Sequence, residues 1–70
     1  MILRMYTVYD KVSGSFSDIK LFTKEELAVR WFNNFKKESP FGLDLDLYYL
    51  GEYNLDTAEI KPVKADFVGV

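Results

Sequence analysis

Residues 23–38 read TKEELAVRWFNNFKKE, and this stretch decides the fold. Apolar residues recur in it at the spacing of one face of an α-helix. They are Leu27, Ala28, Trp31, Phe32 and Phe35. Thr23, followed three residues later by Glu26, has the pattern of a capping box, which predicts that the helix begins there. Pro40 disfavours helical geometry in the residue before it, so the helix is expected to end near Glu38.

Alternating patterns on both sides of this helix predict a β-sheet. The strands expected over residues 3–10 and 45–53 have apolar or aromatic side chains on both faces, which is typical of central strands, and we expect them to pair. Residues 16–22 alternate more weakly and predict a short or irregular strand. Residues 58–63 predict a returning edge strand, because Pro62 has no amide hydrogen to donate to a central ladder.

The elements together predict an α+β fold, in which a small antiparallel sheet in ββαββ order has one helix packed across one face. A chain of 70 residues has no room for a second domain. We expect a single domain over residues 1–63 and a C-terminal tail over residues 64–70. One helix covers only one face of a sheet, so we expect another molecule to cover the second face.

The composition excludes most catalytic chemistry. The chain has no cysteine and no histidine, which removes disulfides, imidazole bases and nearly every zinc geometry. Asp44 and Asp46 point to the same side of an extended chain, but two carboxylates are too few for a metal site. The four glycines are isolated and cannot form a phosphate-binding loop. We therefore expect neither an enzyme nor a bound cofactor or metal.

Charge is distributed unevenly along a chain of net charge −2. Residues 1–38 contain seven Lys/Arg and five Asp/Glu, whereas residues 39–70 contain two and six. This asymmetry is compatible with a basic face on an acidic protein and also with self-association through complementary patches. No window approaches the roughly 20 apolar residues of a membrane span, and the N-terminus lacks a signal-peptide pattern. We expect a protein of the cytoplasm that does not contact membranes.

Basic and aromatic residues are the candidates for binding. Arg30 and Lys37 lie two helical turns apart and share a face, with Lys36 beside it, and Lys11 and Lys20 could extend that surface. An ordinary solvated helix face is the simpler interpretation of these five. Tyrosines tolerate a half-wet surface, and four of them are candidates for an interface or for stacking bases. These are Tyr6, Tyr48, Tyr49 and Tyr53. The residues alone leave open whether single-stranded nucleic acid or a second subunit covers the sheet.

Three blocks of the sequence carry a resemblance to a known family. They read YTVYDKVSGSF at residues 6–16, AVRWF at residues 28–32 and LYYLGEYN at residues 47–54, and Thr57 and Ile60 follow. In this order they resemble the small nonstructural protein of gokushovirus-type microviruses, which are single-stranded DNA phages. The resemblance covers about residues 6–62. Ala58 stands where that family often has a glycine.

The resemblance implies a non-enzymatic phage accessory protein of the host cytoplasm that binds single-stranded DNA during genome synthesis or packaging. Lys11 and Arg30 lie inside the matched blocks and are the first choice for phosphate contacts, followed by Lys20, Lys36 and Lys37. Because few phosphates would be neutralised by these basic residues, we expect this binding to be weak and sensitive to salt. The alternative function is an assembly module, in which a homodimer recruits a capsid or replication protein without touching DNA. The net negative charge favours this alternative.

Overall fold

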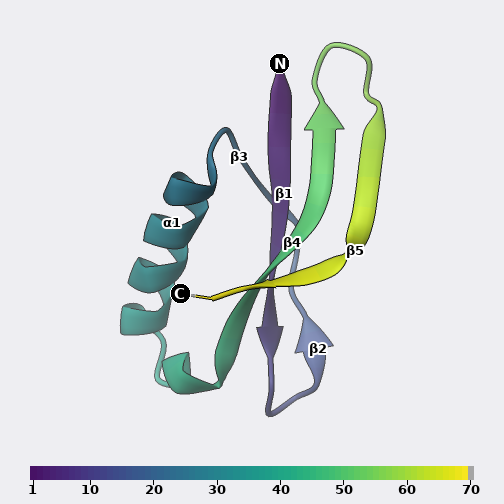
Figure 1. The fold of residues 1–70 in the computed structure, drawn as a ribbon. Coiled ribbons are helices and arrows are strands. Elements are labelled where there is room, and N and C mark those ends of the chain that lie inside the picture. Colours follow the sequence, from purple (N-terminus) through teal and green to yellow (C-terminus); the bar gives the residue numbers. More distant parts are fainter. Residues whose placement is uncertain (70) are drawn as a thin grey trace.

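The computed structural model describes residues 1–69. Seven elements follow one another along the chain: β1 (Ile2–Asp10), β2 (Ser15–Phe16), β3 (Lys20–Phe22), α1 (Glu25–Glu38), the 3-10 helix η1 (Gly42–Asp44), β4 (Leu45–Asn54) and β5 (Ile60–Val68). The strands form one antiparallel sheet, and α1 lies against one side of it (Figure 1). The predicted α+β class and the single helix are confirmed.

The centre of the sheet is the pair β1 and β4. The strand order is β2-β1-β4-β5, and β3 also pairs with β1, nearer its N-terminal end than β2 does. β1 and β4 pair along their whole length, from Ile2 opposite Asn54 to Asp10 opposite Leu45. The expectation that the two strands with apolar groups on both faces pair centrally is therefore confirmed, and so is the edge position of the strand that contains Pro62.

The sheet has one more strand than the ββαββ order predicts, because the weak second strand is interrupted. β2 and β3 both pair with β1, while residues 17–19 leave the ladder. Ser17 still anchors this gap. Its amide donates to the carbonyl of Val8 at 2.9 Å, and its carbonyl accepts from the hydroxyl of Thr7 at 2.9 Å. The irregularity that the sequence predicts is thus a local break in one edge strand.

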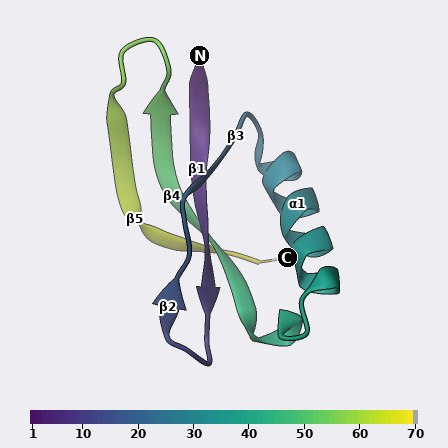
Figure 2. The same ribbon diagram turned by 180° about the vertical axis from the view of Figure 1, so that it is seen from behind.

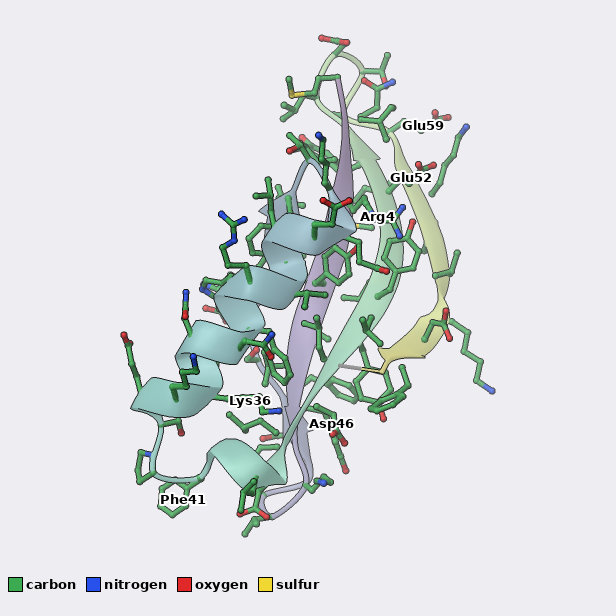
Figure 3. All side chains as sticks on the ribbon, turned by 60° about the vertical axis from the view of Figure 1, so that its left-hand side comes forward. Arg4, Lys36, Phe41, Asp46, Glu52 and Glu59 are labelled. Atoms are coloured by element: carbon green, nitrogen blue, oxygen red, sulfur yellow. The ribbon has the colours of Figure 1, made fainter. Side chains whose placement is uncertain are left out.

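The core lies between α1 and the sheet. Ala28 and Phe32 on the helix are buried against Tyr6 and Val8 of β1 and against Leu47 of β4. These positions match the helical spacing on one side and the alternation of strands on the other. Figure 3 looks onto α1 with the sheet behind it and shows that the helix covers only one face.

Two bulges curl the sheet. Leu50 is an extra residue in β4, between the pairs of β1 with Tyr49 and Gly51. On the other side of β4, residues 63–65 of β5 stand opposite Leu50 alone. Such insertions bend a strand, and β5 turns sharply at this point toward the helix (Figure 1).

The boundary expected after residue 63 is not present in the structure. Residues 64–68 continue β5, and Phe67 and Val68 pair with Tyr48 and Leu47 of β4. The bulge explains this correction, because it lets the strand pass Pro62 and resume its ladder. Val68 then packs against the core. The last residue of the predicted tail, Val70, lies outside the described residues.

The helix begins later than the capping box predicts. α1 starts at Glu25, its N-cap residue is Lys24, and no side chain caps it. The carboxylate of Glu25 accepts instead from Arg4 and Tyr6 on β1. This contact between distant segments fixes the first turn, so the local Thr23–Glu26 pairing is not used. The predicted end at Glu38 is confirmed.

At two positions with positive φ, exchanging glycine and alanine should change the free energy of unfolding in opposite directions. Gly51 has φ 121°, and a Cβ added there would collide with the carbonyl oxygen of Lys61. Ala58 has φ 61° in the β4–β5 turn, a region that favours glycine. Gly51→Ala should lower the free energy of unfolding by about 2 kcal/mol or more. Ala58→Gly should raise it by about 0.5–1 kcal/mol.

Urea unfolding followed by far-ultraviolet circular dichroism measures both changes. Gly69→Ala is the matched control, since an added Cβ there lies 3.8 Å from the Phe67 ring and meets nothing nearer. A Gly51→Ala protein as stable as the parent would contradict the described approach of β4 and β5.

Candidate nucleic-acid interface

A row of four aromatic rings crosses the sheet on the face opposite α1. It takes one ring from each strand in the order β2, β1, β4, β5: Phe16, Tyr9, Tyr48 and Phe67. The ring centroids are 4.7 Å apart for Phe16 and Tyr9, 6.1 Å for Tyr9 and Tyr48, and 5.8 Å for Tyr48 and Phe67. The Phe16 centroid also lies 5.7 Å from that of Tyr48, so the rings of β2, β1 and β4 are in mutual contact. We call this set the aromatic row.

Strand register assembles the aromatic row. Tyr9 stands opposite Phe16, and Tyr48 stands opposite Phe67. Tyr9 alternates with the core residue Val8 along β1 and therefore points away from the helix. Seen from behind, α1 stands at the side of the sheet and does not cross in front of its strands (Figure 2).

The outer rings of the row are open to solvent. Phe16 is 54% exposed and Phe67 is 56% exposed, while Tyr9 and Tyr48 between them are half-buried. Exposed rings on a sheet face offer flat surfaces on which unstacked bases or another aromatic surface can pack. The row is therefore the feature of the described residues best suited to bind a planar partner.

The charge beside the aromatic row is balanced. The ammonium of Lys11 lies 3.9 Å from the carboxylate of Asp46, which stands opposite Tyr9 on the same face. Both side chains are partly exposed, so the pair contributes little to stability. Lys11 thus reaches the edge of the row, as the DNA-binding prediction requires, but an acid accompanies it.

The other predicted cations are not brought together with Lys11. Arg30 and Lys37 are exposed and lie on the side of α1 opposite Ala28, hence on the far side of the sheet from the aromatic row. The ammonium of Lys36 lies 5.2 Å from the Phe32 ring centroid, on the inner side of the helix (Figure 3). Lys20 stands at the edge strand β3, opposite Tyr6.

The four predicted tyrosines divide between the two faces. Tyr48 belongs to the aromatic row, and Tyr53 lies on the same face toward its other end, opposite Leu3 and Ile60. Tyr49 is on the helix side, where its ring centroid is 5.4 Å from that of Tyr6. Tyr6 itself is fully buried. The expectation that Tyr6 stacks on a partner is corrected, because it is part of the core.

Tyr6 anchors a polar network between β1 and the first turn of α1. The Nε–H of Arg4 donates to the Tyr6 hydroxyl at 2.7 Å, and that hydroxyl donates to Glu25 at 3.1 Å. The Arg4 guanidinium also lies 4.3 Å from the Tyr49 ring centroid. Burial raises the pKa of Tyr6, and the hydrogen bond from Arg4 opposes this effect. The bond to Tyr6 raises the pKa of Arg4.

Both edges of the sheet are poorly suited to pairing with another strand. One edge is formed by β2 and β3, which have only two and three residues. The other is β5, which contains Pro62, two lysines and a bulge. Short strands, proline, lysine and bulges all discourage strand addition. A partner would therefore pack on the open face and not extend the sheet.

Two further features of the described residues concern their acidic side chains and their helices. Among residues 1–69, no three acidic side chains cluster as a metal site would require. Asp46 instead pairs with Lys11, and the carbonyl of Asp44 accepts from the Lys11 amide at 2.8 Å. None of the helices in this part is long and apolar enough to cross a membrane.

Comparison with known proteins identifies the family. A family model described as Phage ORF5 protein matches residues 3–69. The chain belongs to this phage protein family. No curated protein and no solved structure matches it. The Phage ORF5 family assigns the chain to phages, while the microvirus origin that the three sequence blocks imply stays a prediction.

Three members of the aromatic row in this Phage ORF5 protein were not among the candidate residues. Tyr9 lies in the predicted strand over residues 3–10, but its partners across the sheet depend on register. Phe16 lies in the interrupted edge strand, and Phe67 lies in the segment expected to be a tail. Only the pairing of four strands, which joins residues far apart in sequence, brings these rings into one row.

The Tyr6 network predicts a loss of stability at alkaline pH. The ordinary tyrosine pKa of 10.0 is raised in the folded state, chiefly by burial. Folding therefore favours the protonated phenol. Its contribution to stability is fully present below pH 10.0 and is lost as the pH rises through the higher folded value.

The free energy of unfolding in urea should be measured at about one pH unit below and about one unit above the ordinary pKa. Between these two pH values it should fall more for the parent than for Tyr6→Phe. The difference between the two proteins isolates Tyr6 from the other titrating groups. An equal loss of unfolding free energy in both proteins would contradict the conclusion that the Tyr6 phenol is buried and protonated in the folded state.

Proposed function

We propose that this phage protein is a non-enzymatic accessory protein that binds single-stranded DNA during genome synthesis or packaging in the host cytoplasm. The observation that carries the proposal is the aromatic row, with its half-exposed Phe16 and Phe67 on the uncovered face. Each base of a single strand has a free π-face, whereas bases in a duplex are already stacked on one another. The row therefore favours single strands.

Stacking, and not charge, supplies most of this affinity. Lys11 is the predicted cation that reaches the open face, and Asp46 already neutralises it. The protein as a whole has a net charge of −2. Because salt sensitivity follows the number of phosphates neutralised, the proposed binding is weak and tolerant of sequence, and its salt sensitivity is milder than the basic residues of the sequence led us to expect. Of the predicted phosphate contacts, Lys11 is the one placed beside the rings.

A protein partner on the same face is the second candidate function. The paired charge of Lys11 and the overall acidity favour it. In this case a second copy covers the aromatic row, and the homodimer recruits a capsid or replication protein without touching DNA. Aromatic side chains are enriched in the cores of such interfaces. The two candidates share the row and differ in what packs on it.

Removing the outer rings tests the proposed function. Phe16→Ala and Phe67→Ala should each weaken binding of a fluorescently labelled oligothymidylate by roughly 5- to 150-fold, because stacking is worth ~1–3 kcal/mol per base. Fluorescence anisotropy at low and moderate salt measures this change. Phe41→Ala is the matched control, since Phe41 is 64% exposed but lies in the loop after α1, away from the row (Figure 3).

The outcomes separate the two candidates. Loss of DNA binding in both row variants, with Phe41→Ala unchanged, supports the single-strand function. If the parent does not bind the oligonucleotide at low salt, that function is wrong. A dimeric mass by light scattering that becomes monomeric in Phe16→Ala would then support the protein partner.

A further inference from the structure

A second set of aromatic rings lies on the helix side of the sheet, between α1 and the interrupted edge strand formed by β2 and β3. Trp31 and Phe35 stack in parallel, with centroids 5.3 Å apart and planes 6° apart. Both belong to the apolar stripe of the helix that packs across the sheet. Phe35 is nevertheless 41% exposed, and Trp31 is half-buried. These two rings are therefore at the margin of the core.

The two rings form the wall of an open hollow. It has a volume of about 420 Å³, and its lining residues are Ser17, Asp18, Lys20, Trp31 and Phe35. Lys20 is the cation among them, and Asp18 is the acid. A flat aromatic wall beside an ammonium group suits a nucleotide, whose base can stack while its phosphate faces the lysine. The hollow exists because residues 17–19 leave the ladder.

A second hollow lies between this one and β2, the strand that carries Phe16 of the aromatic row. It has a volume of about 240 Å³ and shares Ser17 and Phe35 with the first, and Phe16 also lines it. Phe16 is the ring of the row on β2, with its centroid 4.7 Å from that of Tyr9 and 5.7 Å from that of Tyr48. Residues of the two hollows thus border a path that leads from the aromatic row past Phe16 to Phe35 and Trp31.

We propose that one DNA strand occupies this whole path, turning over the β2 edge after it leaves the aromatic row. Its next base stacks on the exposed side of Phe35, and Lys20 binds the adjacent phosphate. This inference rests on the proposed function and adds a second subsite to it. The subsite also gives a role to Lys20, which is otherwise distant from Lys11 and the row.

The only tryptophan of the chain makes the subsite directly observable. An oligothymidylate of about four nucleotides, one for each ring of the row, should bind without changing Trp31 fluorescence. An oligothymidylate of about ten nucleotides reaches the hollow and should quench that fluorescence. Anisotropy of the labelled strands gives the affinity of each, independently of the tryptophan signal.

Lys20→Gln should weaken binding of the ten-nucleotide strand several-fold and leave the affinity for the four-nucleotide strand unchanged. Lys61→Gln is the matched control, because it removes the same charge from β5 at the opposite edge of the sheet. Phe35→Ala should weaken binding of the longer strand by roughly 5- to 150-fold. Circular dichroism checks that this variant is folded. Lys20 is exposed, so its substitution leaves the core intact.

The inference and the proposed function fail in different ways. If both strands bind but the longer one neither quenches Trp31 nor responds to Lys20→Gln, the second subsite is wrong and the row remains the site. Equal quenching by both strands also contradicts the path, since the short strand would then occupy the hollow. If neither strand binds, the proposed function is wrong, and the subsite with it.

Discussion

The packing of Ala28 and Phe32 onto Tyr6, Val8 and Leu47 is the interaction on which the rest of the structure depends. It uses the only long helix of the described residues to cover one face of the sheet. A sheet has two faces, and no second α-helix among the described residues covers the other one. The aromatic row is the consequence, because aromatic side chains alternate with the core residues of the same strands.

Sequence patterns predicted those parts of the fold that local chemistry determines. The apolar stripe of α1, its end at Glu38, the central pair of strands and the edge position of Pro62 all follow from spacing or from backbone chemistry. The sequence predicted the start of α1 and the end of β5 at the wrong residues, because both depend on contacts between residues that are distant in the sequence. Glu25 bonds to β1 and shifts the helix start, and the bulge opposite Leu50 lets β5 continue to Val68.

The candidate site was less predictable for the same reason. Tyrosine content indicated an uncovered sheet face, but choosing the face of each ring requires the register and the extra residue Leu50 in β4. Tyr6 therefore lies in the core, while Phe16 and Phe67 lie in the open. The predicted basic residues sit on different surfaces, because helix geometry separates Arg30 and Lys37 from the strand turn that contains Lys11. Rings, and not a basic patch, characterise the open face.

The most direct measurement is a nuclear magnetic resonance titration of the aromatic ring protons with oligothymidylate. If bases stack on the uncovered face, the resonances of Phe16, Tyr48 and Phe67 move upfield, while those of the buried Phe32 stay in place. Binding that leaves the ring protons of the row unchanged, or that perturbs only the outer face of α1, would contradict the account.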